Sequence, residues 1–430
     1  MFKRFQNDRR GNVVQIFALA IIPLIGSVGI AVDYSRASSA RTALQGALDS
    51  TALYLAKEAG RLTAEQLSAR AQEVFAANFN RSEARAMTVN ATFSETESGW
   101  NVKVTAAGKV DATITSILGH DTTNIGGSAE VAWGMKKLEL VLALDNTGSM
   151  SSNNKMTELK TAAKTLLTTL QGASLKPDHI KVSIVPFATD VNVGTANKTA
   201  TWLDWSEWDA ANGYLGCPPG ATPIGNSGKC RLANGNQVQE SWQADHDTWK
   251  GCVTDRAKDH DVLDTTPTSM VTKFVPHQAS NCPVELLALT NSWSTLSAKI
   301  DSMTPTGNTN VTIGLAWAWH ALTGSLPLTQ AAAVSQNLDK IIILLTDGDN
   351  TQNRWSNIKA DIDARTKLAC ANVKAAGISL YTIRVINGDA ALLQECASSP
   401  SMYYDVQNAS QLSSIFNQIA KNLANLRLAK

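Results

Sequence analysis

Five oxygen-bearing side chains stand in three separate loops of this 430-residue chain, and their types suit cation binding. They are two carboxylates and three hydroxyls: Asp145, Asp347, Thr147, Ser149 and a hydroxyl from the loop 306–310, which contains Thr306 and Thr309. Hard oxygen ligands from separate loops fit a small divalent cation, which prefers oxygen and keeps some of its water molecules. We therefore predict a divalent-cation site at these residues, with Mg²⁺ as the expected ion and Mn²⁺ or Ca²⁺ as alternatives.

The charge of such a site indicates what it would bind. Two carboxylates at most neutralise a divalent cation, and a carboxylate that acts through a bridging water leaves the cation partly positive. Neutral hydroxyls in the remaining positions keep the cation electrophilic, whereas a calcium buffer would use more carboxylates. The pattern favours a binding site for an acidic ligand over a metal store.

Four continuous apolar runs must position these loops. Such runs are typical of strands buried on both faces, and here they span residues 138–144, 180–187, 340–346 and 378–385. Helical patterns follow them, over residues 155–170, 311–322, 358–376 and 410–426. Strands that alternate with helices predict an α/β fold with a doubly wound, mostly parallel sheet, whose ligands bind beyond the carboxyl ends of the strands. Asp145 and Asp347 each follow one of these runs, so we expect both at one edge of the sheet.

Residues 192–281 interrupt this alternation and read as an insertion. The segment is rich in Gly, Pro and Asn, and it carries five tryptophans: Trp202, Trp205, Trp208, Trp242 and Trp249. Because it has few aliphatic residues, disulfides are expected to supply much of its order. The tryptophans either form the insertion's own small core, which we favour, or a recognition surface.

The six cysteines predict disulfides in an oxidising compartment, since their number is even and none forms a C-x-x-C pair. We expect Cys370 to pair with Cys396. The other four should staple the insertion: Cys217, Cys230, Cys252 and Cys282. A zinc site with His246, His260 or His277 is the weaker reading, because the spacing matches no zinc-binding pattern.

The N-terminal region predicts a membrane anchor. Residues 13–32 carry no formal charge and are long enough to cross a hydrocarbon core of roughly 30 Å as a helix. Four basic residues precede this stretch: Lys3, Arg4, Arg9 and Arg10. The positive-inside rule then keeps the N-terminus in the cytoplasm and the bulk of a single-pass, inner-membrane protein in the periplasm. A cleaved signal peptide is the alternative, although no A-x-A site follows Val32.

The segment between the anchor and the α/β region predicts a small pilin-like module. Residues 34–80 are Ala-rich and should continue the anchor as helix, and residues 87–133 alternate as in a small antiparallel sheet. The expected division is therefore an anchor over 1–33, an α+β module over 34–136, and the α/β domain over 137–430. A net charge of +1 gives no electrostatic footprint for nucleic acid.

Two parts of the chain resemble known families. Asp145-x-Thr147-x-Ser149, the Thr309 loop and Asp347-Gly348 resemble the metal-ion-dependent adhesion site (MIDAS) of von Willebrand factor type A domains, from residue 138 to the end. The segment RRGNVVQIFALAIIPLIGSVGIAVDYSRASSARTALQGALDSTAL is similar to the start of TadG-type proteins of the Flp (tight adherence) pilus system. The order of the two signatures makes the resemblance specific.

The resemblance implies a membrane-anchored, non-enzymatic protein of Flp pilus assembly or adhesion that binds protein partners through a metal ion. Asp145, Thr147, Ser149, Thr309 and Asp347 would match the metal-site residues of the family. Thr147 replaces the more common serine but keeps the hydroxyl. TadE-like relatives carry a glutamate five residues after the processed glycine, whereas Ile16 stands there after Gly11, which puts cleavage at Gly11 in doubt.

Two other functions are compatible with the same residues. A metal-dependent hydrolase would use Asp145 or Asp347 with a metal-bound water, but the chain has no G-x-S-x-G, H-E-x-x-H or P-loop motif, and His120, His179 and His320 are scattered. A structural stalk with a vestigial metal site is the third possibility. The sequence therefore predicts that the protein is not an enzyme.

Overall fold

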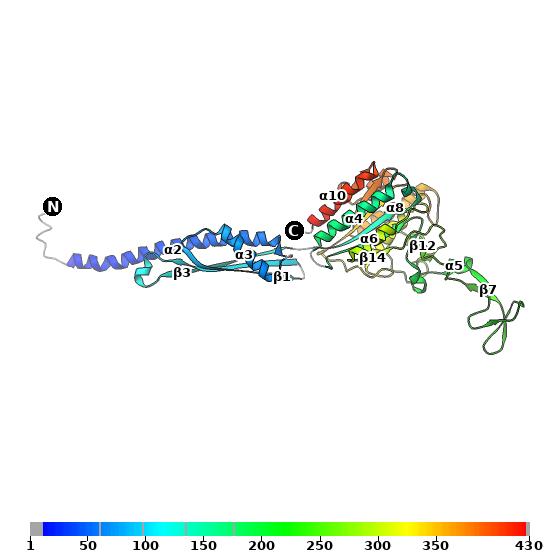
Figure 1. Ribbon diagram of the computed structural model, residues 1–430, viewed down its shortest axis with the longest axis horizontal. Helices are drawn as coiled ribbons and strands as arrows, with labels where there is room; N and C mark the ends of the chain where they lie inside the picture. Colours follow the sequence, from blue (N-terminus) through cyan, green and yellow to red (C-terminus); the bar gives the residue numbers. More distant parts are fainter. Residues whose placement is uncertain (1–11, 60–61, 97–98, 134–135, 175–176, 427–430) are drawn as a thin grey trace. The chain divides into compact units, whose positions relative to one another are not determined.

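The computed structural model describes residues 12–59, 62–96, 99–133, 136–174 and 177–426 (Figure 1). The basic residues of the predicted anchor flank, Lys3 to Arg10, and the glycine at position 11 lie outside these residues. The chain divides into two compact units, Met1–Met135 and Lys136–Ala429. Each unit is described by itself.

The first unit joins two helices to a three-stranded antiparallel sheet. The helices are α2 (Asn12–Ala56) and α3 (Ala64–Asn78), and the strands are β1 (Ala84–Thr96), β2 (Gly99–Asp111) and β3 (Thr122–Trp133), with a short 3-10 turn, η2 (Thr115–Leu118). Strand β2 is central and pairs with both neighbours. Leucines of α2, Phe75 of α3 and valines of β2 form the core of this unit.

The expected single helix over residues 34–80 is wrong in one respect, because the chain forms two helices there. Helix α2 ends at Ala56, and Thr63 starts α3 with a capping box in which its side chain accepts from the Gln66 backbone and Gln66 accepts from the Thr63 backbone. Such reciprocal bonds satisfy free N–H groups at a new helix start. Among the described residues, α2 is the helix long and apolar enough to cross a membrane.

The second unit is built on a nine-stranded sheet. Its parallel part has the order β5-β4-β15-β16-β17, with bounds β5 (Ile180–Phe187), β4 (Lys137–Asp145), β15 (Leu338–Thr346), β16 (Ser379–Val385) and β17 (Tyr403–Val406). Short antiparallel strands extend it: β6 (Val191–Asn192), β12 (Cys252–Thr254), β13 (Val275–Pro276) and β14 (Leu287–Thr290). The predicted doubly wound, mostly parallel α/β sheet is confirmed.

Helices cover both faces of this sheet because its strands are apolar on both faces. One core holds alternate residues of β4, such as Leu140 and Leu142, under α4 (Lys155–Ala173), α6 (Trp293–Ser302) and α10 (Leu412–Leu426). The other core holds Val141 and Ala143 under α7 (Val311–Thr323), α8 (Lys359–Ala375) and α9 (Ala390–Cys396). Four 3-10 turns link these elements: η3 (Gly148–Ser151), η4 (Thr195–Thr199), η5 (Pro400–Met402) and η6 (Ala409–Gln411).

The insertion divides into a part that packs on the sheet and an arm. Trp202 and Trp208 are buried in the same core as Trp317 of α7, with the Trp202 and Trp317 rings 6.2 Å apart. These tryptophans therefore join the main core of the unit instead of forming a separate small core, because α7 offers them an aromatic surface. After α5 (Ser206–Ala211) the arm extends away from the sheet (Figure 1), through β7 (Gly213–Gly216), β8 (Thr222–Pro223), β9 (Lys229–Arg231), β10 (Gln237–Gln239) and β11 (Ser241–Ala244).

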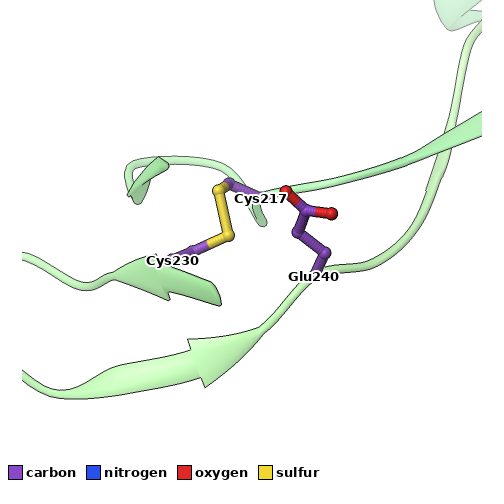
Figure 2. Close-up of side chains that lie close together, drawn as sticks. All are labelled: Cys217, Cys230 and Glu240. Atoms are coloured by element: carbon purple, nitrogen blue, oxygen red, sulfur yellow. A yellow bond between two sulfur atoms is a disulfide. The ribbon is translucent and has the colours of Figure 1, made fainter. Parts of the chain in front are cut away.

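All six cysteines form disulfides. Cys370 pairs with Cys396, as expected, and joins α8 to the end of α9. Cys217 pairs with Cys230 in the arm, and Cys252 of β12 pairs with Cys282. Glu240 lies beside the arm disulfide (Figure 2), but the two sulfurs are bonded to each other and cannot act as thiolate ligands.

Candidate metal centre

The candidate site lies at the carboxyl ends of β4 and β15, which are adjacent parallel strands. Asp145 is the last residue of β4, and Asp347 directly follows β15. Thr147 and Ser149 stand in the turn before α4, and Thr309 lies in the loop before α7. The fold therefore brings together the three loops that the sequence singled out.

Asp145 is fully buried beneath the other predicted residues. One carboxylate oxygen accepts from the backbone N–H of Thr147 at 2.8 Å and from its hydroxyl at 2.5 Å. The other accepts from the Thr346 hydroxyl at 2.6 Å. Burial, followed by the nearby charge of Asp347, raises the pKa of Asp145 to about 6. A bound cation would oppose this shift, because it stabilises the ionised carboxylate.

Hydroxyl groups connect the two aspartates. The Thr147 and Ser149 oxygens lie 2.9 Å apart, and the Ser149 hydroxyl donates to one oxygen of Asp347 at 2.6 Å. A hydroxyl can donate its proton to a carboxylate and still offer a lone pair to a cation. The network therefore holds the hydroxyls in place without using up their capacity as ligands.

The Thr309 loop closes the site from the side of α7. The Thr309 N–H donates to the Thr351 hydroxyl at 2.9 Å, and the Gly148 N–H donates to the Gly307 carbonyl at 3.0 Å. A Cβ atom built on Gly348 would lie 3.6 Å from the Thr309 hydroxyl oxygen and 3.7 Å from that of Ser149. Both hydroxyls therefore face the same small space beside Gly348.

Lys155, which the sequence analysis missed, completes the charge balance of the site. Its ammonium group lies 2.7 Å from the second oxygen of Asp347, and both side chains are almost fully buried. Lys155 begins α4, where the helix dipole disfavours a positive charge. A lysine at the start of a helix, six residues after the D-x-T-x-S pattern, was therefore the sequence signal that could have identified Lys155 as part of the site.

A cavity of about 340 Å³ opens onto the cluster, and Ser149, Thr309 and Asp347 contribute to its lining. Asp145 and Thr147 are buried and do not line the cavity, although the Thr147 hydroxyl contacts Ser149, which does. The set of oxygen donors fits a divalent cation. The Asp347 carboxylate and the Ser149 and Thr309 hydroxyls line one open space, and Asp145 adds a second carboxylate to the cluster. The open side leaves room for a ligand from outside.

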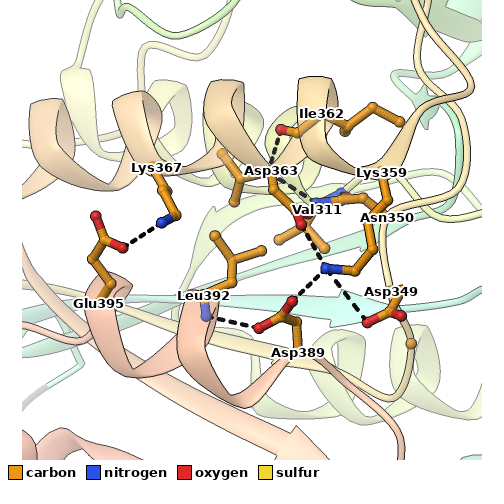
Figure 3. A network of polar contacts seen from close by, with 12 residues as sticks. Val311, Asp349, Asn350, Lys359, Ile362, Asp363, Lys367, Asp389, Leu392 and Glu395 are labelled. Atoms are coloured by element: carbon orange, nitrogen blue, oxygen red, sulfur yellow. Dashed lines mark hydrogen bonds and ion pairs between the residues drawn. The ribbon is translucent and has the colours of Figure 1, made fainter.

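The loop after β15 is held by a separate polar network (Figure 3). The Asn350 amide accepts from the Val311 N–H and donates to Asp363, each at 2.8 Å. Lys359 forms ion pairs with Asp363 and Asp389. These contacts tie the Asp347 loop to the start of α7 and to α8, so the loop is positioned before any cation binds.

A second cavity, of about 260 Å³, adjoins the first and shares Asn308 with it. It is lined by the insertion end around His277 and by Asp190, whose carboxylate lies 3.0 Å from His277 Nδ1. The hydrogen bond that His277 donates to the Asp190 carboxylate raises the pKa of His277. The insertion thus contributes polar side chains next to the candidate site.

A sheet of this topology, with oxygen-bearing side chains at the carboxyl ends of its parallel strands, is typical of a von Willebrand factor type A domain. The model of that family matches residues 278–418. The matched region begins at the end of the insertion, yet β4 and β5, which precede the insertion, belong to the same sheet.

A second family model, described as Flp pilus-assembly TadE/G-like, matches residues 11–57. The chain therefore combines a TadE/G-like N-terminal segment with a C-terminal von Willebrand factor type A domain. The predicted family resemblance is confirmed.

Solved structures with similar folds include two pilus proteins. The pilus adhesin SpaC of Lactobacillus rhamnosus GG is 15% identical, with a TM-score of 0.38 over 80% of this chain and 35% of that one. The von Willebrand factor domain of the pilus tip protein Mfa5 of Porphyromonas gingivalis is 12% identical, with a TM-score of 0.40 over 69% of this chain and 98% of that one.

A third is the mussel byssus protein PTMP1 with a zinc-occupied MIDAS motif, 14% identical, with a TM-score of 0.34 over 67% of this chain and 46% of that one. The chain thus spans about a third of the SpaC chain and about half of the PTMP1 chain. Comparison with curated protein sequences found no match.

Proposed function

We propose that this membrane-anchored, TadG-like protein binds a protein partner through a divalent cation held at the edge of its α/β sheet. The observation that carries the proposal is that three loops bring two carboxylates and three hydroxyls into one cluster, of which Ser149, Thr309 and Asp347 line an open cavity. Ser149, Thr309 and Asp347 would hold the cation directly, with Asp145 and Thr147 behind them. The expected ion is Mg²⁺, with Mn²⁺ or Ca²⁺ as alternatives.

The bound cation would supply an electrophile for a carboxylate of the partner. Lys155 matters here because its ammonium already neutralises part of Asp347, at 2.7 Å. The remaining negative charge is then smaller than that of two free carboxylates, so a divalent ion keeps positive charge for an incoming acidic group. This supports a protein that captures a carboxylate-bearing component of the pilus or cell envelope.

Binding is favoured over hydrolysis by the residues around the cavity. Its described lining residues are Ser149, Gly307, Asn308, Thr309, Asp347, Gly348, Asp349, Thr351 and Asn387. The Ser149 hydroxyl donates to Asp347, a carboxylate whose other oxygen is held by Lys155, so that pair offers no free base. We therefore propose a non-enzymatic role.

The metal site is tested by cation titration of the full chain in lipid nanodiscs. Mn²⁺ binding is followed by calorimetry and by the electron paramagnetic resonance of the ion, for wild type and Ser149→Ala. We expect Ser149→Ala to weaken Mn²⁺ binding at least tenfold. Ser151→Ala is the matched control, because the Ser151 hydroxyl is exposed and donates to the Gly148 carbonyl. Equal Mn²⁺ affinity of Ser149→Ala and Ser151→Ala would contradict the site, and no Mn²⁺ binding to wild type would favour the structural-stalk alternative.

The partner is tested by crosslinking in the periplasm, comparing wild type with Asp145→Ala. A crosslinked species present only with wild type would name the partner and link it to the cation. The same crosslinks in both would refute cation-dependent capture.

The domain boundaries and the topology stay predictions. Limited proteolysis should cut between the predicted parts 1–33, 34–136 and 137–430, and protease protection in inverted and intact vesicles should report a cytoplasmic N-terminus and a periplasmic bulk in the inner membrane.

A further inference from the structure

The connection between β2 and β3 is fastened to α2 at the end of the apolar stretch. The Asp33 carboxylate, 6% exposed, accepts backbone N–H bonds from Thr113 at 2.9 Å, Ile114 at 3.0 Å and Thr115 at 2.8 Å. The Thr115 hydroxyl adds a fourth bond at 2.8 Å. A single carboxylate thus fixes this connection, residues 112–121, against the helix (Figure 1).

One helical turn before Asp33, a glycine lets the connection touch the helix backbone. Gly29 is buried, and a Cβ atom built there would lie 2.4 Å from Cγ2 of Ile114. No side chain other than hydrogen fits at that distance. Ile114 therefore packs on a residue that belongs to the uncharged stretch 13–32.

This contact sets the level of the connection along the helix. Gly29 precedes Val32, the last residue of the uncharged stretch, by three positions, which is about 4.5 Å along a helix. Ile114 therefore lies at the level of the last apolar turn. Ile117, in η2, is 83% exposed, and on α2 itself Ile30 and Tyr34 are 57% and 69% exposed. Exposed apolar side chains thus stand both on the helix and on the connection fastened to it, and a tyrosine follows the last apolar turn of the helix.

We propose that residues 112–121 insert into the interface of the lipid bilayer, beside the anchor and in the leaflet nearest the folded units, with Ile117 in contact with acyl chains. The occupant is lipid because the connection is fastened to the last apolar turn of the anchor helix, whose apolar residues lie exposed over most of the uncharged stretch. Tyrosine is typical of the polar edge of a membrane span, where Tyr34 stands. The α+β module then contacts the membrane at a second point.

The test uses the full chain in nanodiscs of phosphatidylethanolamine and phosphatidylglycerol. All native cysteines of the described chain are in disulfides, so an introduced cysteine can be labelled selectively with an environment-sensitive fluorophore. Three single variants are compared: Ile117→Cys in the connection, Ile22→Cys in the anchor, and Ser94→Cys as an exposed control on β1. Quenching is measured with lipids that carry nitroxides at shallow or deep positions.

We expect shallow nitroxides to quench the label at position 117 at least twofold more than at position 94, and deep nitroxides to quench the label at 22. In Ile117→Cys, adding Asp33→Asn should at least halve the quenching, because the amide cannot accept all four bonds of the carboxylate. If 22 is quenched while 117 behaves like 94, the inserted connection is refuted and the anchor stands. If 22 is not quenched, both the anchor and the inserted connection are refuted.

Discussion

Asp33 in the first unit and Asp145 in the second are both buried aspartates, yet their surroundings differ in kind. Asp33 accepts mainly from backbone N–H groups, which are donors only and cannot bind a cation. Asp145 accepts from the hydroxyls of Thr147 and Thr346. The Thr147 hydroxyl in turn contacts the Ser149 hydroxyl, and Ser149 lines an open cavity. A buried carboxylate therefore indicates a binding site only where its partners can also offer lone pairs to a ligand.

The largest effect is expected from breaking the buried pair of the second unit. Asp347→Ala leaves the Lys155 ammonium buried without a partner, which should lower the free energy of unfolding by about 3–5 kcal/mol and abolish Mn²⁺ binding. Chemical denaturation and calorimetry measure the two effects. The double variant Asp347→Ala/Lys155→Met should recover most of the stability but no Mn²⁺ binding. A double variant as unstable as the single one would contradict the buried-charge explanation.

A third buried aspartate should make stability depend on pH. Burial raises the pKa of Asp255 to about 7 from an ordinary 3.8, so between these values the unfolded chain ionises while the folded protein keeps the proton. Stability is therefore lost as pH rises from about 4 through 7. Asp255→Asn should be more stable than wild type at pH 8, on the order of a few kcal/mol.

The measurement for Asp255 is urea denaturation at pH 5 and pH 8. The gain of Asp255→Asn should shrink at pH 5, where less of the ionisation cost is present in wild type. Asp204→Asn serves as a control, because Asp204 is half-buried and bonded to Ser206 in the same unit. A gain for Asp255→Asn that does not change with pH would exclude Asp255 ionisation as its cause.

Asp33→Asn tests the role of the buried aspartate of the first unit. The amides of residues 113–115 lose their charged acceptor, which should lower the free energy of unfolding by about 1–3 kcal/mol. Hydrogen exchange of these amides should accelerate accordingly. Mn²⁺ affinity should stay unchanged, because Asp33 belongs to the unit without the candidate site. Altered Mn²⁺ affinity in this variant would remove the distinction between the two aspartates.

The smallest change in Mn²⁺ affinity is expected from Lys155→Met, which keeps the aliphatic bulk but removes the positive charge beside Asp347. Mn²⁺ binding should tighten about tenfold, or about 1.4 kcal/mol, because the cation no longer meets a neighbouring ammonium. Calorimetry of the full chain measures it, with Lys160→Met as control, because Lys160 is a half-buried lysine of the same helix that donates to the Asp301 carbonyl of α6. Weaker binding in Lys155→Met would mean that the lysine orients Asp347 for the cation instead of competing with it.

Much of the second unit could be predicted because its signals are local. Each apolar run of the sequence corresponds to a parallel strand, and the helices between them begin and end within a few residues of the predicted bounds. Short elements such as β14, β17 and α9 were not predicted, since a few residues carry no clear periodicity. The break between α2 and α3 was also missed, because the Ala-rich pattern continues across the capping box.

The sequence by itself determined where the long parallel strands lie, that Asp145 and Asp347 stand at the ends of two of them, and that an uncharged stretch, residues 13–32, lies near the N-terminus. Strand order in a parallel sheet then brings the two carboxylates to one edge, so the candidate site followed from pattern and topology together. Only the tertiary structure decided the pairing of Lys155 with Asp347 and two packing contacts, that of Trp202 with Trp317 and that of Ile114 with Gly29. These contacts join residues far apart in the chain, and they depend on shape and register, which no local pattern encodes.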